Sequence, residues 1–510
     1  MREGHLVLLI FLHLLNYGLS AAEDEYFVST EGSDQWDGTS EAHVEGTDVG
    51  PWQTLNHAMK EITQLRPYPP TADSHATVNL LKGTHYLTST VEMYNADSHM
   101  TIKALHEDEE VVVSGGKVLD GEWEEGQGGI MTTTFEGTCG ESFVGIQRLM
   151  PARSPNLEGF GYNWNTALPP YNTIKDLLLE TETCTRNSTD YKQECPYEDK
   201  LGFVFEDEFS ADWPYLGQTN VMVFDSGIAE TAIIGNITGD KVFFKEPLGG
   251  QPVGNKPLSS GWRYLIFNNM ALLDIPGECV CNEIGEGQAR FSYIPPSGEE
   301  FENLPVVVSQ INPVVSVYNV TDLLLEGITF KHAASAGYSN LDYGNAAALK
   351  IERSNRIMIT DCMFTQTGMT GLFGQFSNNI QVTKSTFIDI GYIGVHFHDS
   401  NTTFDEVEGQ TNILIDNNNF SGCGVSNLWQ PNCVKVAGFN NITVRNNDIQ
   451  KVAYAAIKIT GYYNRGGNYW EDNGVIEPTR EDYVIHVEYN YIQNYGLGIL
   501  NDMGAIYIRK

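Results

Sequence analysis

The chain has 510 residues, of which 41% are hydrophobic, so it is long enough for a large core and for two or three domains. It carries 30 basic against 66 acidic side chains, a formal net charge of −36. A field of that sign repels nucleic acid and anionic membranes, which argues against both as partners, and it attracts cations such as calcium.

The first 22 residues have the layout of a secretory signal peptide. Arg2 precedes an apolar run from Leu6 to Leu15, and small residues follow up to Ala22. A membrane-spanning helix needs about 20 apolar residues, and this run is half that length. We therefore predict a signal peptide over residues 1–22 and a secreted, extracellular protein.

Eight cysteines fit an oxidising compartment, and they lack the paired short spacings with histidine that a zinc site requires. Cys184 with Cys195, and Cys423 with Cys433, each bracket a short polar loop, so we predict these two disulfides. Six sequons predict N-glycosylation of a secreted chain. Their asparagines are Asn187, Asn236, Asn319, Asn401, Asn419 and Asn441.

Residues 23–125 begin with a Gly- and Asp-rich loop and continue into a short helix. Thr54 is a suitable N-cap before Leu55, Ala58, Met59 and Ile62, which recur at helical spacing. Two short strands closed by glycine follow, Thr77–Tyr86 and Val111–Gly116. Residues 126–310 then carry strand-like runs at irregular spacing, which predicts a β-rich insertion.

Residues 311–510 contain an eight-residue repeat with apolar residues at its first, third and eighth positions. A strand whose alternate residues face a bore cannot bury them alone, but stacked copies form one continuous core. The pattern predicts parallel β-helix coils, and Asn418, Asn447 and Asn490 predict a hydrogen-bonded ladder. A sandwich is the alternative, but hairpin turns between copies are missing. The six copies are Leu323–Phe330, Ile357–Phe364, Ile380–Phe387, Ile413–Phe420, Ile442–Ile449 and Ile485–Ile492.

Three short motifs resemble those of pectin-lyase-like β-helix proteins. They are Leu81-Lys-Gly-Thr-His-Tyr86 with Val113-Ser-Gly-Gly116, Ala152-Arg-Ser-Pro-Asn156, and Asp502-Met-Gly-Ala-Ile-Tyr507. The resemblance implies an all-β, right-handed parallel β-helix with an N-terminal capping helix, into which the β-rich segment of residues 126–310 is inserted. The last two motifs are similar to those of β-helix glycoside hydrolases. Related chains continue for further coils, so the resemblance also implies that this chain, ending at Lys510, is truncated at its C-terminus.

In proteins of this shape, ligands lie along the outer face of one parallel sheet, and a second strand follows each repeat here. Alternation places Leu349, Val395, Val434 and Ile457 inward. Most of the outward positions are basic or aromatic, in a protein short of bases. They are Lys350, Glu352, Phe373, Gln375, His396, His398, Lys435, Lys458, Tyr507 and Arg509.

This outward column suggests a site for an acidic polysaccharide. Amines pair with uronate or sulfate groups, and Lys350, Phe373, Gln375, Lys458, Tyr507 and Arg509 are the expected binding residues. For β-elimination, His396, His398 or Lys435 would remove the proton beside the carboxylate. The alternative is that these are ordinary polar residues on a strand.

Glycoside hydrolysis needs two carboxyl groups roughly 5 to 9 Å apart. The resemblance carries Asp502 over as one of them. Asp399 is a weaker partner, because the related proteins have a Gly-rich sequence where this chain has His396-Phe-His-Asp399. Asp502 could instead be a turn residue that bonds to its own backbone.

Two functions stay open at this point. One is a secreted enzyme or binding protein for extracellular polysaccharide, of glycosidase or lyase type. The other is a non-enzymatic acidic extracellular-matrix protein associated with calcium or mineral. No cofactor is certain; calcium is a candidate ligand, at Asp416–Asn419 or between Asp24 and Asp37, although the same residues suit turns.

Overall fold

The computed structural model describes residues 24–156, 171–178, 201–206, 209–224, 229–246, 258, 260–298, 303–335, 346–398, 412–426, 428, 430–438, 441–460, 484–496 and 504–509. Within these residues, no helix is long and apolar enough to cross a membrane.

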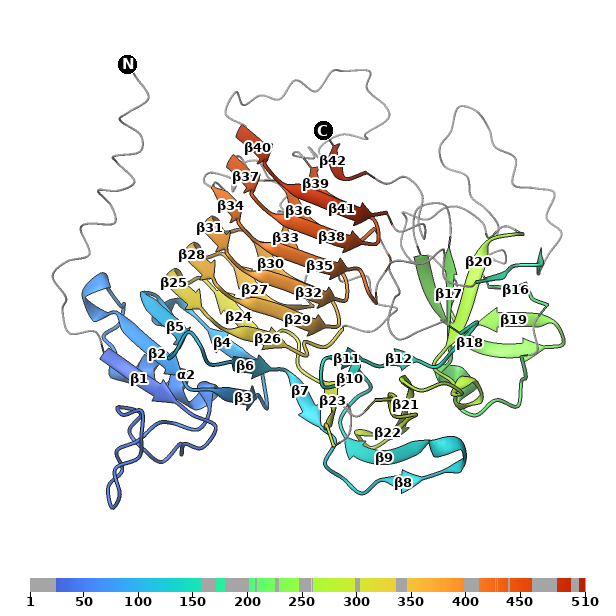
Figure 1. Ribbon diagram of the computed structural model, residues 1–510, viewed down its shortest axis with the longest axis horizontal. Helices are drawn as coiled ribbons and strands as arrows, with labels where there is room; N and C mark the ends of the chain where they lie inside the picture. The colour runs from blue at the N-terminus through green and yellow to red at the C-terminus, as the bar shows by residue number, and fades with distance from the viewer. Residues whose placement is uncertain are drawn as a thin grey trace.

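Three long parallel sheets form the body of the molecule, and consecutive strands of the chain pass from sheet A to sheet B to sheet C (Figure 1). The result is a right-handed parallel β-helix, as predicted. Sheet A contains β1 (Asp24–Val28), β2 (Ala76–Leu80), β5 (Met100–Ala104), β25 (Thr321–Glu326), β28 (Asn355–Thr360), β31 (Asn378–Thr383), β34 (Ile413–Asp416), β37 (Asn441–Arg445) and β40 (Val484–Glu488).

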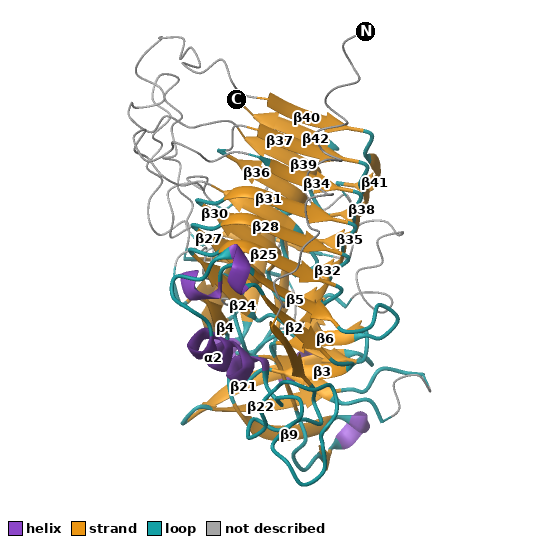
Figure 2. Cartoon of the chain, turned by 90° about the vertical axis from the view of Figure 1, so that its left-hand side faces the viewer, coloured by secondary structure: helices purple, strands orange, loops and turns teal. Residues whose placement is uncertain are grey.

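Sheets B and C complete each coil, and Figure 2 shows the strands as rungs stacked along the helix axis. Sheet B contains β3 (Gly83–Tyr86), β6 (Val111–Ser114), β26 (Thr329–Lys331), β29 (Met363–Thr367), β32 (Thr386–Ile390), β35 (Asn419–Cys423), β38 (Asp448–Val452) and β41 (Tyr491–Tyr495). Sheet C contains β4 (Val91–Met93), β24 (Val315–Tyr318), β27 (Ala347–Glu352), β30 (Thr370–Gln375), β33 (Val395–His398), β36 (Asn432–Ala437), β39 (Ala455–Thr460) and β42 (Ile506–Arg509).

The repeated apolar positions fill the bore. The eighth residues Phe330, Phe364, Phe387 and Phe420 are fully buried, and neighbouring ring centroids lie 5.0, 4.7 and 4.8 Å apart with nearly parallel planes. That spacing equals the distance between hydrogen-bonded strands, about 4.8 Å, because each ring sits on the same rung position.

The predicted asparagine ladder is present inside the turn between sheets A and B. The Nδ2 of Asn418 donates to the Oδ1 of Asn447 at 3.0 Å, and the Nδ2 of Asn447 donates to the Oδ1 of Asn490 at 2.9 Å. Each side chain also serves the backbone, since the Nδ2 of Asn447 donates to the Ile415 carbonyl. The ladder satisfies buried polar groups that a turn without strand pairing would leave open.

Helix α2 (Leu55–Leu65) covers the first coil. Thr54 caps it by accepting from the His57 backbone N–H at 3.2 Å, and Leu55, Ala58, Met59 and Ile62 join the core of the bore. The described residues also form the short 3₁₀ helices η1 (Ala72–Ser74), η2 (Asn95–Asp97), η3 (Gln127–Gly129), η5 (Leu216–Gln218) and η6 (Met270–Leu272).

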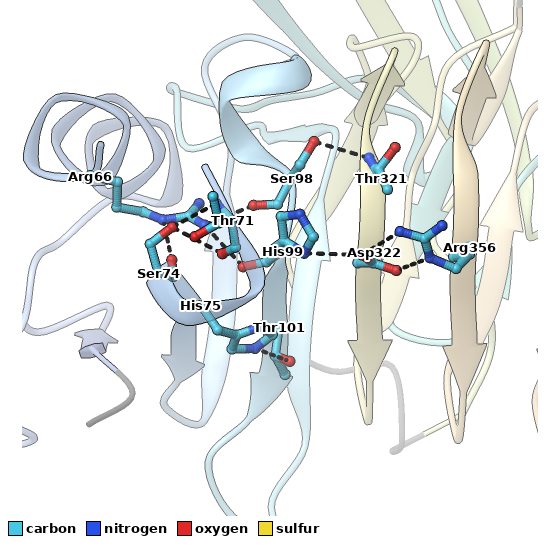
Figure 3. Close-up of polar contacts among 10 residues, drawn as sticks. All are labelled: Arg66, Thr71, Ser74, His75, Ser98, His99, Thr101, Thr321, Asp322 and Arg356. Atoms are coloured by element: carbon cyan, nitrogen blue, oxygen red, sulfur yellow. Dashed lines mark hydrogen bonds and ion pairs between the residues drawn. The ribbon is translucent and has the colours of Figure 1, made fainter. Parts of the chain in front are cut away.

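A buried arginine fixes the end of this helix to the coils. The guanidinium of Arg66 donates to the carbonyls of Ser74, Ser98 and His99 (Figure 3). On the next rung, Asp322 contacts both His99 and Arg356 (Figure 3). These contacts join the cap to the stack without using the apolar core.

The chain leaves the β-helix after β6 and returns at β24, and three smaller sheets lie between. The first contains β7 (Gly116–Val118), β10 (Ser142–Val144), β11 (Gln147–Arg148) and β23 (Val306–Ser309). The second contains β8 (Glu124–Glu125), β9 (Met131–Glu136), β12 (Met150–Pro151), β21 (Glu278–Gly285) and β22 (Gln288–Tyr293). The third contains β13 (Arg153–Ser154), β14 (Asn172–Thr173), β15 (Asp176–Leu177), β16 (Gly202–Val204), β17 (Asn220–Phe224), β18 (Ala229–Thr238), β19 (Lys241–Phe244) and β20 (Arg263–Phe267).

Arg148 docks this β-rich segment onto the side of the coils. Its guanidinium donates to the carboxylate of Asp389 at 2.9 Å, to the carbonyls of Asp389 and Thr367, and to the Ser426 hydroxyl. Glu141 reaches the same side and accepts from the Ser335 N–H. Thr367 and Asp389 lie at the C-terminal ends of sheet B strands and Ser426 follows another, so the segment is positioned against the flank of the β-helix where sheet B leads into sheet C.

Two disulfides are formed by described residues. Cys423 pairs with Cys433, as predicted from their spacing. Cys139 pairs with Cys281 inside the insertion, a bond that the spacing did not predict. Cys279 and Cys362 are buried free thiols, and Cys184 and Cys195 lie outside the described residues.

Candidate functional site

The outward residues of sheet C form one continuous row. Adjacent strands pair Ser316 with Lys350, Lys350 with Phe373, and so on up the stack. The row runs through Ser316, Lys350, Phe373, His396, Lys435, Lys458 and Tyr507. The alternation of the sequence therefore places these side chains on a single flank, while Leu349, Val395, Val434 and Ile457 face the core.

A second row lies two residues further along each strand. Glu352 pairs with Gln375, and Tyr318 pairs with Glu352 on the other side. Higher in the stack, His398, Ala437, Thr460 and Arg509 are in register. Only the backbone of Arg509 is described, so its side chain is not placed.

The lower part of the first row carries little net charge. Lys350 forms an ion pair with Glu352 on its own strand, with a nitrogen–oxygen distance of 3.2 Å. Phe373 is 1% exposed, and its ring packs edge-on against His396 at 5.3 Å. Phe373 therefore positions the imidazole instead of offering a ring face to a ligand, which differs from the role expected from the sequence.

His396 is a neutral imidazole in this setting. It is 3% exposed, and burial, with Lys435 as the next contributor, lowers its pKa well below the usual value. Both of its ring nitrogens are buried without a hydrogen-bond partner among the described residues. A neutral imidazole has one donor and one acceptor, so His396 offers hydrogen bonds to a ligand but not the positive charge that its residue type suggested.

Lys435 lies on the rung above His396, and its ammonium group is desolvated. Burial, and then the neighbouring Lys458, lower its pKa to about 8. Among the residues that the structure describes, Lys435 has no hydrogen-bond or ion-pair partner. A lysine held in this way can bind an anion in its charged form and accept a proton in its neutral form.

Lys458 is held between aromatic rings on the next rung. Its Nζ lies 5.9 Å from the ring centroid of Tyr454 and 5.6 Å from that of Tyr507. It also donates to the side-chain carbonyl of Gln430 at 3.2 Å. These contacts fix the second cation of the row, so the charge of the site is concentrated at Lys435 and Lys458.

The insertion contributes a wall beside this upper part of the row. Met222, Phe224 and Leu265 of its third sheet form one apolar cluster with Leu428 and Tyr454 of the β-helix, and Tyr171 and Tyr507 pack on its edge. Arg263 lies over the rings of Tyr171 and Phe224. The site is therefore composite, with a floor from sheet C and one side from the insertion.

A cavity of about 70 Å³ opens between the insertion and the coils, but it does not contain the row. Glu141, Arg148, Cys279, Val425 and Ser426 are among its lining residues. Glu141 has a buried carboxylate oxygen there with no partner among the described residues.

Several predicted site residues lie outside the described residues. These are Asp399, Asp502, Asn187 and Asn401. The sequon asparagines that are described, Asn236, Asn319, Asn419 and Asn441, are all exposed. Exposure is the condition that glycosylation requires, although it does not establish the modification.

The acidic turns considered for calcium are occupied by protein donors. Asp34 accepts from the backbone N–H groups of Gln53 and Thr54, and Asp416 accepts from Arg445 and Asn446. Within the described part of the chain, no three or more His, Cys, Asp or Glu side chains are grouped to hold a metal ion. These donors come from distant segments of the chain and not from the residues' own turns, and calcium binding stays a prediction.

Comparison with known proteins supports the fold. No protein-family model and no curated protein matches the sequence. A solved glycoside hydrolase is similar, with a TM-score of 0.63, 18% identity, and coverage of 86% of this chain and 79% of that chain. XylC, solved with xylose, gives a TM-score of 0.44 at 11% identity, covering 86% of this chain and 60% of that chain. The tailspike gp61 of Pseudomonas phage phi297 gives 0.15 at 10% identity, covering 79% and 65%.

The first likeness shows that the two chains share a parallel β-helix, and the other two are too distant in structure to add to it. Sequence reasoning missed Gln430, Tyr454 and the insertion residues Tyr171 and Arg263 as neighbours of the row. Tyr454 precedes the strand that carries Lys458, which is the one signal that could have drawn attention to it. The insertion residues approach through long-range packing, which the repeat pattern does not encode.

Proposed function

We propose that the protein is a secreted glycoprotein that binds an acidic extracellular polysaccharide along the outer face of sheet C. The observation that carries the proposal is Lys435, a desolvated lysine beside a second lysine, without an acceptor among the described residues. Two neighbouring cations at the site are costly unless an anion joins them.

The surroundings of Lys435 suit a sugar acid. A carboxylate or sulfate group placed there would accept from Lys435 and Lys458, and the imidazole of His396 would donate or accept a further hydrogen bond. Tyr507, which is partly exposed, offers a ring beside the amine of Lys458, whereas Tyr454 is buried and holds that amine in place. The shared fold with a glycoside hydrolase fits a carbohydrate ligand, but at 18% identity it transfers no activity.

Secretion and glycosylation belong to the same proposal. The signal-like N-terminus, the six sequons and two disulfides agree with an oxidising, extracellular compartment. A mass measurement of the secreted chain before and after glycan removal would test both.

Binding to a uronic-acid polymer, compared with a neutral polymer of the same length, tests the central proposal. We expect the wild type to prefer the acidic polymer and Lys435→Met to lose about 10- to 100-fold in affinity, because a charge-assisted contact disappears. Lys384→Met is the matched control, since Lys384 has a side chain that is 61% exposed on another face. Equal affinity of the wild type for both polymers, or equal losses in the two variants, would contradict the proposal.

Lys435 also favours β-elimination as the chemistry. Its neutral amine would take the proton from the carbon next to the carboxylate. The released electron pair forms a double bond to the neighbouring carbon while the glycosidic bond breaks, and the departing oxygen takes up a proton.

Because the pKa of Lys435 is about 8, the elimination activity should rise with pH through that value. Ultraviolet absorbance of the unsaturated product measures it. Reducing ends released without absorbance would indicate hydrolysis, for which Asp502 and Asp399 are the candidates.

The charge of −36 favours one alternative, a non-enzymatic acidic matrix protein. This function predicts calcium binding or adsorption to carbonate mineral by the full chain. Equilibrium calcium binding and mineral adsorption measure it, and indifference to both would remove this alternative.

A further inference from the structure

Two exposed tyrosines stand at the N-terminal end of sheet C. Tyr94 is 53% exposed and Tyr318 is 40% exposed, and their ring centroids lie 6.4 Å apart at an angle of 65°. Tyr94 directly follows β4, and Tyr318 ends β24, the strand paired with β4. Alternation from the buried Met93 and Val317 places both rings on the outward face, the face that carries Lys435 further up.

The aromatic edge continues onto the next coils. Tyr318 pairs with Glu352, and Glu352 pairs with Gln375. Immediately after those two strand residues, Arg353 lies over the ring of Phe376 at 5.2 Å. The edge of sheet C therefore carries the exposed rings of Tyr94 and Tyr318 and, two strands further on, the ring of Phe376 beneath Arg353.

The charge at this end differs from the charge around Lys435. Glu92 accepts from the Tyr94 hydroxyl at 3.4 Å, and Lys350 is neutralised by Glu352. Carboxylates and amides of this kind accept from sugar hydroxyls, and tyrosine rings offer an apolar face to the C–H bonds of a sugar. The chemistry suits neutral sugar units and disfavours acidic ones.

The distance between Lys435 and the two tyrosines sets a minimum length for the ligand. From β36, which carries Lys435, to β24 there are four strand steps, and at about 4.8 Å per step Tyr318 lies roughly 19 Å away. Tyr94 lies one step further. A single sugar cannot bridge this distance, whereas an extended chain of several units can.

We infer that Tyr94 and Tyr318 form a remote platform for neutral sugar units of the polysaccharide chain whose acidic unit lies at Lys435. This inference rests on the proposed function of the row. It names the ligand as a polymer that combines acidic and neutral units and follows sheet C for at least five coils. A rival occupant is the chain's own glycan, because Asn319 is an exposed sequon directly after Tyr318.

The test compares ligand lengths. Affinity is measured for an acidic oligosaccharide of two or three units and for a long acidic-neutral copolymer, using the wild type and the double variant Tyr94→Ala/Tyr318→Ala. We expect the double variant to lose about tenfold in affinity for the polymer, because two linked contacts are removed, and to keep its affinity for the short ligand. Tyr86→Ala is the matched control, an exposed tyrosine at 41% on sheet B.

The outcomes separate the two proposals. If the wild type binds neither ligand, the function proposed for the row fails. If it binds both and the double variant loses nothing, or loses equally on both, the platform alone is overturned. A length-dependent gain that appears only in Asn319→Gln would also overturn it, because the platform would then be covered by the protein's own glycan.

Discussion

At the scale of single residues, the charge state of a side chain in the row depends more on its rung of the β-helix than on its residue type. Lys350, Lys435 and Lys458 occupy the same row position on different rungs. Lys350 is neutralised by a carboxylate on its own strand, Lys458 is stabilised between two rings, and Lys435 is desolvated. Three identical side chains therefore serve as a neutral pair, a fixed cation and a group that titrates near neutral pH.

The desolvation of Lys435 should lower the stability of the folded protein, and a bound anion should raise it again. Its folded pKa of about 8 lies below the usual 10.5, so the unfolded chain binds more protons between those values and stability rises with pH across that window. At pH 7 we expect Lys435→Met to be more stable than the wild type by about 1 to 3 kcal/mol. The difference should shrink towards pH 10.5.

Chemical denaturation at pH 7 and pH 10 measures this difference. A variant that is less stable than the wild type at pH 7 would show that Lys435 is satisfied in the folded protein, and the anion site would lose its main support.

At the scale of elements, the coils carry two asparagine ladders with different surroundings, one in the turns between sheets A and B and the other where the sheet A strands begin. Asn447 belongs to the inner ladder and is 1% exposed. Asn412 belongs to an outer ladder, where its Nδ2 donates to Asn379 at 2.7 Å and its Oδ1 accepts from Asn441. Hydrogen bonds of similar length should therefore contribute differently to the free energy of unfolding, because water can replace only those of the outer ladder.

We expect Asn447→Ala to destabilise the protein by about 2 to 4 kcal/mol, because it removes the acceptor that the buried Asn418 backbone N–H and side-chain amide share. Asn412→Ala should cost less than about 0.5 kcal/mol. Urea denaturation of both variants measures the difference. Equal costs would mean that the inner ladder is solvated and does not hold the coils together.

The repeat made the coils predictable, since the apolar first, third and eighth positions specify strand, register and inward face together. It also located the Asn418–Asn490 ladder and the row through Lys435. The neutral state of His396 was not predictable, because it follows from burial beside Phe373 and Lys435. The disulfide between Cys139 and Cys281 was not predictable either, because it joins residues 142 positions apart in the sequence.

At the scale of the whole molecule, the insertion is fixed to the β-helix at a few points. Arg148 supplies four hydrogen bonds to Thr367, Asp389 and Ser426, at or just after the ends of sheet B strands, and Glu141 accepts from Ser335 nearby. An apolar cluster around Phe224 and Tyr454 adds a separate contact. Burial raises the pKa of Asp389, and the guanidinium of Arg148 opposes that rise. The interface is thus polar at one end and apolar at the other.

Arg148→Met should loosen the insertion without unfolding the coils. The loss leaves the Asp389 carboxylate without its cation, at a cost of about 2 to 4 kcal/mol. Amide hydrogen exchange should accelerate in β17 and β20 and stay unchanged in β28 and β31. Arg356→Met is the control, since Arg356 makes an exposed ion pair with Asp322. Uniform acceleration across both sets of strands would show that the insertion and the coils open as one unit.

The point at which the insertion leaves and re-enters the β-helix has a consequence for biosynthesis. Strand β6 pairs directly with β26, and the Gly115 carbonyl accepts from the N–H groups of Gln310 and Ile311, so roughly 200 residues separate rungs that are neighbours in space. During translation, the N-terminal coils emerge long before the rung that completes them. The strand edge of these coils stays unpaired until the insertion has been synthesised. We expect a chaperone, or early folding of the insertion itself, to protect that edge from self-association.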